Sequence, residues 1–103
     1  MNDSTDLLLS ERGNTHGDFT DNSQVAQAIK RVIQNGLKGT SLKDYQQEAL
    51  DMIAHKIGRI VAGNSDFKDH WDDIAGYARL VSDRLSLPDK KLPSVFGSKK
   101  SSK

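Results

Sequence analysis

Hydrophobic residues recur at intervals of three and four along three long stretches of the chain, which is the period of an amphipathic α-helix. The first stretch covers residues 25–33, the second residues 42–61 and the third residues 71–85. In the second stretch the apolar positions cover more than one face, so this helix is expected to be central. No stretch alternates as a half-buried strand does. The pattern predicts an all-α fold, a small bundle of three main helices plus a short N-terminal one.

Capping residues set the expected boundaries of these helices. The expected starts are Asp21, Asn22 or Ser23 for the first main helix, Ser41 (with Asp44 completing a capping box) for the second, and Asp69 for the third. The expected ends are Gly36 and Gly39, then Ala62-Gly63-Asn64, then Pro88. The short N-terminal helix is expected to start at Ser4 or Thr5 and to end near Gly13.

Length and charge divide the chain of 103 residues into one domain and a tail. Residues 1–88 carry ten Lys and Arg against thirteen Asp and Glu, whereas residues 89–103 carry five Lys and one Asp. We therefore expect an α-helical domain over 1–88 and a basic, disordered tail over 89–103. An acidic body argues against nucleic acid as a partner, except for weak contact through the tail.

Other compositional features concern the compartment and the assembly. The chain has no cysteine, so it has neither a disulfide framework nor a thiolate metal site. No apolar run approaches the roughly 20 residues that span a bilayer, and no signal peptide is recognised. We expect a cytoplasmic protein without a membrane partner. Its modest core and the apolar faces of its central helix favour a homo-oligomer.

Acidic and histidine side chains form a polar stripe on each of the last two predicted helices, because residues three and four apart are neighbours on a helix. The first stripe holds Glu48, Asp51, His55 and Arg59. The second holds His70, Asp73 and Tyr77. If the two helices pack antiparallel, several carboxylates converge, which raises the free energy unless a cation or a proton offsets the repulsion.

This convergence suggests a site for Mg²⁺ or Mn²⁺, since hard cations prefer oxygen ligands. The predicted metal ligands are Glu48, Asp51 and Asp73, with Asp72 or His70 assisting. The alternative is a solvated acidic surface on the second helix and, at the start of the third, acids that complement the helix dipole.

Basic residues beside the first stripe allow phosphate chemistry. His55 is a ligand, a general base or a half-buried histidine bonded to Asp51, and these alternatives stay open. Lys56 and Arg59 either stabilise phosphate charge or only neutralise the acids. His55 and Lys56 are the predicted catalytic residues, and Arg59 and Tyr77 are predicted ligand contacts.

The string ERGNTHGDF, residues 11–19, is a loop punctuated by glycine. Its Arg12, His16 and Asp18 are predicted to contact phosphate or to close over a pocket; the alternative for His16 is a local turn contact with Asp18. Gly58 and Gly76 each lie inside a predicted helix, which indicates close helix packing or room for a ligand.

Three strings in order, ERGNTHGDF, EALDMIAHKIGRIVAG and DHWDDIAGYARL, resemble a small domain family of unknown function found in phages and prophages. The resemblance covers about residues 7–86 and implies a phage or prophage origin, hence the cytoplasm of a bacterial host. It implies no activity.

A second resemblance is to the MazG-type all-α nucleoside triphosphate pyrophosphohydrolases. That family carries E-x-x-E and E-x-x-D on consecutive helices, where Glu48 and Asp51, then His70 and Asp73, stand here. The resemblance implies Mg²⁺ held over a nucleotide. Asp51 is shorter than the family's Glu, and His70 replaces a carboxylate.

Two functions are therefore expected from the sequence. The first is a Mg²⁺-dependent, nucleotide-directed hydrolase that releases pyrophosphate. The alternative is a phage protein without enzymatic activity, which sequesters a nucleotide or binds a host protein to counter a defence. Whether the protein hydrolyses the nucleotide or only sequesters it, the partner is a nucleotide or another phosphate-containing small molecule.

Overall fold

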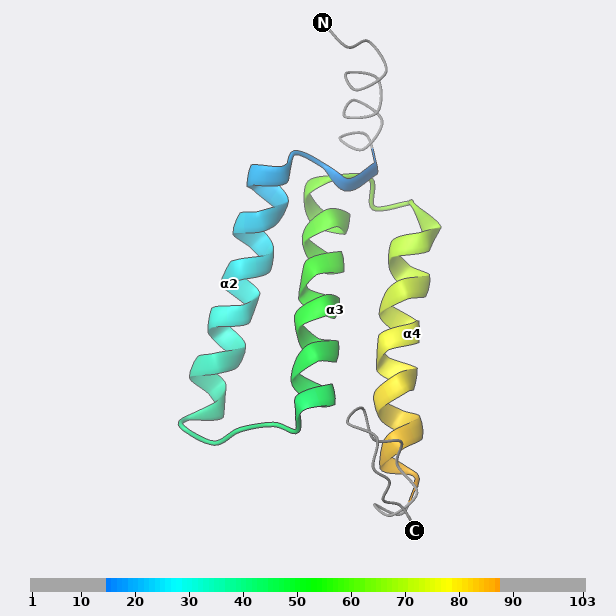
Figure 1. Cartoon of the computed structure of the whole chain (residues 1–103). Helices are drawn as coiled ribbons and strands as arrows, with labels where there is room; N and C mark the ends of the chain where they lie inside the picture. Colours follow the sequence, from blue (N-terminus) through cyan, green and yellow to red (C-terminus); the bar gives the residue numbers. More distant parts are fainter. Residues whose placement is uncertain (1–14, 88–103) are drawn as a thin grey trace, which may run out of the picture.

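The computed structural model describes residues 15–87, which form three α-helices. These are α2 (Phe19–Leu37), α3 (Asp44–Ala62) and α4 (Lys68–Leu85). Neighbouring helices run antiparallel, and α3 lies between α2 and α4 in a single layer (Figure 1). Within this range there is no strand, so the all-α prediction is confirmed. The loop predicted over residues 11–19 is helical at Thr15 and His16, so that prediction was wrong there. The predicted N-terminal helix from residue 4 or 5 to about 13 and the tail over 89–103 lie outside the described residues.

The helices begin at other residues than those predicted. Asp18 caps α2 by accepting a hydrogen bond from the Asp21 N–H at 3.3 Å, so the expected start at residues 21–23 was wrong by about one turn. α3 begins at Asp44 instead of Ser41, and the Lys43 N–H donates to Gln46 Oε1 at 3.0 Å. Asp69 was wrong as the cap of α4, because the capping position is Phe67.

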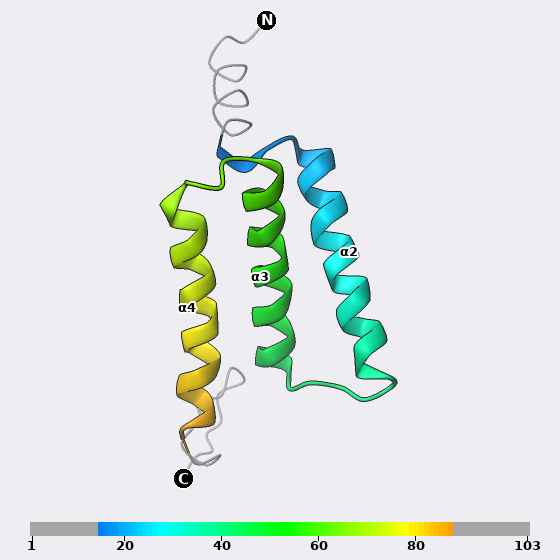
Figure 2. The ribbon, with the colours of Figure 1, turned by 180° about the vertical axis from the view of Figure 1, so that it is seen from behind.

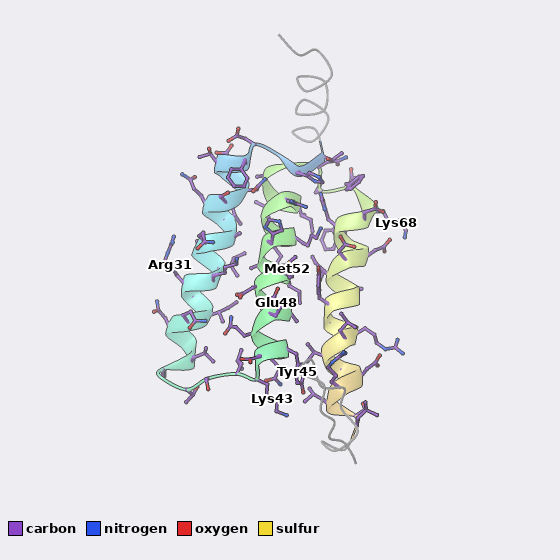
Figure 3. The ribbon with its side chains drawn as sticks, viewed as in Figure 1. Arg31, Lys43, Tyr45, Glu48, Met52 and Lys68 are labelled. Carbon is purple, nitrogen blue, oxygen red and sulfur yellow. The ribbon has the colours of Figure 1, made fainter. Side chains whose placement is uncertain are left out.

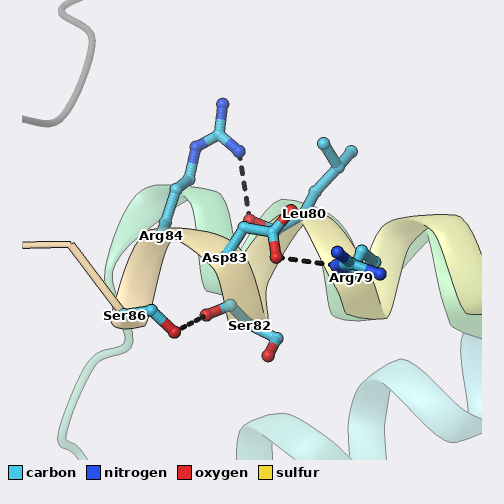
Figure 4. A network of polar contacts seen from close by, with 6 residues as sticks. All are labelled: Arg79, Leu80, Ser82, Asp83, Arg84 and Ser86. Atoms are coloured by element: carbon cyan, nitrogen blue, oxygen red, sulfur yellow. Dashed lines mark hydrogen bonds and ion pairs between the residues drawn. The ribbon is translucent and has the colours of Figure 1, made fainter.

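The helix ends agree more closely with the sequence. α3 ends at Ala62 before Gly63, as predicted. α2 ends at Leu37, where Lys38 adopts a left-handed conformation with φ 52° and Gly39 follows with φ 85°. At the end of α4, the Ser86 hydroxyl donates to the Ser82 carbonyl oxygen at 3.1 Å and Arg84 donates to the Leu80 carbonyl oxygen at 3.0 Å (Figure 4). The last turn of α4 is therefore closed by its own side chains before Pro88.

A single layer of helices buries few large side chains. The buried apolar residues among those described are Ala26, Ala49, Ala54 and Ile60. By contrast, Val32, Val61, Trp71 and Leu85 are 70%, 65%, 53% and 55% exposed. None of the helices within residues 15–87 is both long enough and apolar enough to cross a membrane.

α3 has two open faces, since α2 contacts it through Gly58 and α4 through Lys56. At 100° per residue these two contacts separate a polar side from an apolar side. The polar face is defined by Lys30, Glu48, Met52, His55, Lys56, Arg59, Asp73 and Tyr77. The apolar face is defined by Val25, Val32, Leu50, Ile53, Ile57, Val61, Trp71, Ala78 and Leu85. Glu48 and Met52 show that the polar face is turned to the viewer in Figure 3. Figure 2 draws the ribbon from the opposite direction, with the apolar side of the layer toward the viewer.

Candidate functional site

Positive charge is concentrated on the polar face around His55. Burial lowers the pKa of His55, and the positive charges of Arg59, Lys56 and Lys30 lower this pKa further. Arg59 and Lys56 belong to α3, whereas Lys30 comes from α2. Two helices therefore bring cationic side chains to one neutral histidine, and the field there favours an anion.

One ion pair crosses from α3 to α4 at the edge of this cluster. Lys56 Nζ lies 2.8 Å from Asp73 Oδ2, with the Lys56 side chain 13% and the Asp73 side chain 47% exposed. The hydrogen bond from Lys56 is the largest cause that lowers the pKa of Asp73. Asp73, which the sequence offers as a metal ligand, is thus engaged as the partner of a cation.

The remaining predicted metal ligands are spread over the layer. Glu48 is exposed, and Asp51 accepts a hydrogen bond from Gln47 Nε2 at 3.0 Å. Asp72 pairs at 2.6 Å with Lys68 on the exposed surface of α4. Among residues 15–87 there is no group of three or more His, Asp or Glu side chains that could hold a metal ion. One chain therefore does not gather the predicted set of ligands, and Glu48 and Asp51, one helical turn apart on α3, are the two predicted ligands that are neighbours on one helix without an ion pair in the described structure.

His70 points away from that face and is 1% exposed. Its Nε2 lies 3.1 Å from the Thr15 carbonyl oxygen and 3.1 Å from His16 Nδ1. A carbonyl oxygen can only accept a hydrogen bond, so the contact with Thr15 assigns a proton to Nε2 of His70. The Phe67 ring meets the His70 ring edge-on with centroids 4.8 Å apart. We call His16, Phe67 and His70 the histidine cluster; it fastens residues 15–17 to the start of α4.

Backbone contacts reinforce this attachment. The Asn64 N–H donates to the Thr15 carbonyl oxygen at 3.2 Å, and Asn22 Nδ2 donates to the His16 carbonyl oxygen at 3.1 Å. Gly17, with φ 82°, passes so close to the end of α3 that a Cβ on it would lie 2.2 Å from the Ala62 carbonyl oxygen. The glycine-containing loop is therefore built to pack against the α3–α4 turn.

The loop residues predicted as phosphate contacts have structural roles where they are described. His16 belongs to the histidine cluster, and Asp18 caps α2. Arg12 lies outside the described residues. Tyr77 is half-buried on the polar face, one turn along α4 from Asp73.

Sequence reasoning missed Lys30 and Phe67. Lys30 and Arg31 together interrupt the apolar run of α2. Their charges show that part of this helix faces solvent, but they do not show which residue lies next to α3. Phe67 directly precedes α4, where an aromatic side chain can pack against the first turn of the helix. The position of Lys30 beside His55 and the packing of Phe67 on His70 both depend on how neighbouring helices are aligned, and the spacing of apolar residues does not predict this alignment.

The lowered pKa of His55 has a consequence for stability. Because the folded state holds this pKa below the ordinary value of 6.5, the unfolded chain binds the proton at higher pH. The contribution of neutral His55 to the free energy of unfolding is complete above pH 6.5, and it is lost as the pH falls through the pKa of His55 in the folded state. We expect His55→Gln to flatten the decrease in the free energy of unfolding between neutral and acidic pH. Urea unfolding at a series of pH values checks this; an unchanged slope would contradict it.

Comparisons with known proteins give a family and no activity. The family described as Domain of unknown function (DUF6378) matches residues 1–85. No curated protein and no solved structure matches the chain significantly.

Proposed function

The chain belongs to the family described as Domain of unknown function (DUF6378), and from its polar face we propose that it binds a phosphate-containing small molecule, first of all a nucleotide. The observation that carries the proposal is the set of cationic side chains from α2 and α3 around His55. Lys56 and Arg59 are one helical turn apart along the same side, and Lys30 approaches from the neighbouring helix. Lys56 is paired with Asp73, so it would exchange this carboxylate for a phosphate oxygen on binding. Charge-assisted hydrogen bonds from such groups to phosphate oxygens are stronger than neutral ones.

The acidic residues on the same face fit the metal that accompanies nucleotides. Mg²⁺ is usually held by one or two carboxylates together with substrate phosphates. Glu48 and Asp51 supply two carboxylates on α3, and Glu48 lies about 16 Å from Arg59 along the helix axis. We propose that Mg²⁺ or Mn²⁺ would be bound together with the ligand, since the described part of one chain does not assemble three metal ligands.

Binding without cleavage is the form of this proposal that we place first. Asp73 is paired with Lys56, and His70 is buried in the histidine cluster, so two of the predicted ligands have other partners. In a phage or prophage, the origin that the sequence resemblance implies, such a protein would sequester a nucleotide. The MazG-type resemblance keeps hydrolysis with pyrophosphate release as the alternative.

Calorimetric titration with a panel of nucleotides, with and without Mg²⁺, tests the proposal when each sample is analysed for products. Unchanged nucleotide after binding supports sequestration, and released pyrophosphate supports the hydrolase. Absence of binding for the whole panel would contradict both and would favour a protein partner in the host. The ring of His55 adds a direct readout by NMR, because a bound phosphate raises its pKa.

Lys30→Met is expected to weaken the binding of a nucleotide roughly tenfold, since the loss of one charged contact amounts to about 1.4 kcal/mol. The matched control is Lys68→Met, which also removes one positive charge but at an exposed position on α4, paired with Asp72. Calorimetry on the two variants measures the difference. If both substitutions weaken nucleotide binding equally, the net charge of the protein and not the position of Lys30 determines the affinity.

A further inference from the structure

The core formed by the described residues 15–87 is too small for the apolar surface that the three helices carry. Among the described residues the buried apolar side chains are three alanines and Ile60. Val32, Val61, Trp71 and Leu85, on all three helices, stay at least half exposed. A contiguous exposed surface of this kind marks an interaction site.

The size of the apolar face matches what a stable dimer needs. α2 and α3 have 19 residues each and α4 has 18, so each helix is about 28 Å long. With helix axes about 9 Å apart, the layer covers roughly 750 Å² as a flat rectangle. The accessible surface follows the side chains and is larger. Stable interfaces bury about 800 Å² on each partner.

The chemistry of this face fits a second copy of the same chain. In the middle turns of the helices this face and the positions next to it carry no charge. The face residues there are Val25, Val32, Leu50, Ile53, Ile57 and Ala78, and their apolar neighbours are Ala28, Ile29, Ile74 and Val81. In a two-fold interface both copies contribute the same surface, so a charged residue near its centre would lie close to the same residue of the other copy. A centre without charges avoids that repulsion, whereas it offers nothing to recognise a charged partner.

The face also contains a hollow and a protruding ring that complement each other. An apolar groove of about 340 Å³ lies between α3 and α4 and is lined by Leu42, Gln46, Ala49, Leu50, Ile53, Ala78 and Val81. Trp71 is 53% exposed near the other end of α4, and its indole N–H donates to the Ser65 carbonyl oxygen at 2.8 Å. The polar atom of this side chain is satisfied, so its ring is free to be covered by apolar atoms.

Trp71 and Val81 are equally far along α4 from Gly76. A two-fold axis at the level of Gly76, lying between the two layers, parallel to them and perpendicular to the helices, would place α4 antiparallel on α4 of the second copy. Trp71 of each copy would then lie over the groove of the other.

We propose that two copies of this chain dock face to face through the apolar face, with Trp71 of each copy in the groove beside Ala78 and Val81 of the other. The result is a double layer of helices in which the two polar faces point outward in opposite directions. Each polar face is then complete within one chain, so the partner does not add residues to it.

The test is the mass of the full chain in solution, by sedimentation equilibrium over a series of concentrations. We expect twice the chain mass of 11.4 kDa. Ala78→Glu, which puts a charge at the groove, is expected to weaken dimerisation at least 100-fold. The control is Leu80→Glu, because Leu80 is 51% exposed on the same helix but on its other side, and this variant is expected to remain a dimer.

A wild-type mass of one chain would overturn the proposal, and so would an Ala78→Glu variant that keeps the dimer mass. A second measurement uses the wild type, so the test does not depend on whether Ala78→Glu folds. Trp71 is the single tryptophan of the chain, so its emission is expected to shift to the red on dilution in step with dissociation. Emission that stays constant through dissociation would show that the copies meet elsewhere, and a monomer with shielded Trp71 would show that the chain covers its own face.

Discussion

Gly58→Ala is expected to destabilise the fold, although alanine is the better helix former. A Cβ at Gly58 would lie 2.5 Å from the backbone carbonyl oxygen of Asn22 and 3.5 Å from the Ala26 Cβ. The obstacle at 2.5 Å is backbone, so α2 as a whole must move away from α3. Overpacking of this kind costs about 1–3 kcal/mol, which the gain in helix propensity of about 1 kcal/mol offsets only in part.

Gly76→Ala is the matched control for this substitution. Gly76 also lies inside a helix, but within residues 15–87 no atom would lie within 4 Å of a Cβ there. The same change of residue is therefore expected to raise the free energy of unfolding by up to about 1 kcal/mol. Urea unfolding of both variants at one protein concentration measures the contrast. A Gly58→Ala protein as stable as the wild type would show that α2 and α3 are not in the close contact described.

His70→Ala is expected to lower the free energy of unfolding by about 2–4 kcal/mol, because it removes a buried ring and leaves a cavity. The change also deprives the Thr15 carbonyl oxygen and His16 Nδ1 of their contact with His70 Nε2. The attachment of residues 15–17 should loosen with it. Faster hydrogen exchange of the Asn64 N–H, which donates to the same Thr15 oxygen, would report that loosening.

The control for His70→Ala is Asp72→Ala, since Asp72 lies two residues further and pairs with Lys68 at the surface. Loss of an exposed ion pair costs less than about 1 kcal/mol. Unfolding is measured in the presence of a chelator, which separates the structural role of His70 from the predicted role as a metal ligand. A His70→Ala protein that is as stable as the wild type with chelator, and differs only when Mg²⁺ is added, would support metal ligation.

The elements of the fold were predictable because they depend on local sequence. Apolar positions at intervals of three and four predicted three helices, and Gly63 predicted the end of α3. The starts were less predictable, since Asp18, Asp21, Asn22 and Ser23 all suit a helix cap. The choice of Asp18 agrees with the packing of Gly17 against Ala62, a contact between residues far apart in the chain.

The arrangement of the candidate site depends on how the helices are turned against each other, which the sequence does not contain. His70 and Asp73 share one stripe in the sequence, yet His70 faces the loop before α2 and Asp73 faces Lys56. Close packing was one of the two roles predicted for both internal glycines. It is confirmed for Gly58, whose neighbours are on α2, but not for Gly76, which has no close neighbour within residues 15–87.

The single layer has a consequence for the order of folding. Each helix packs on its neighbour in the chain, α2 on α3 and α3 on α4, so both hairpins form through local contacts, which favours fast folding. The contact between His16 and His70 joins residues 54 positions apart and closes a loop that contains both hairpins. Closing that loop has the larger entropic cost, so it is expected to come last. The same contact should be among the first to open when the protein unfolds.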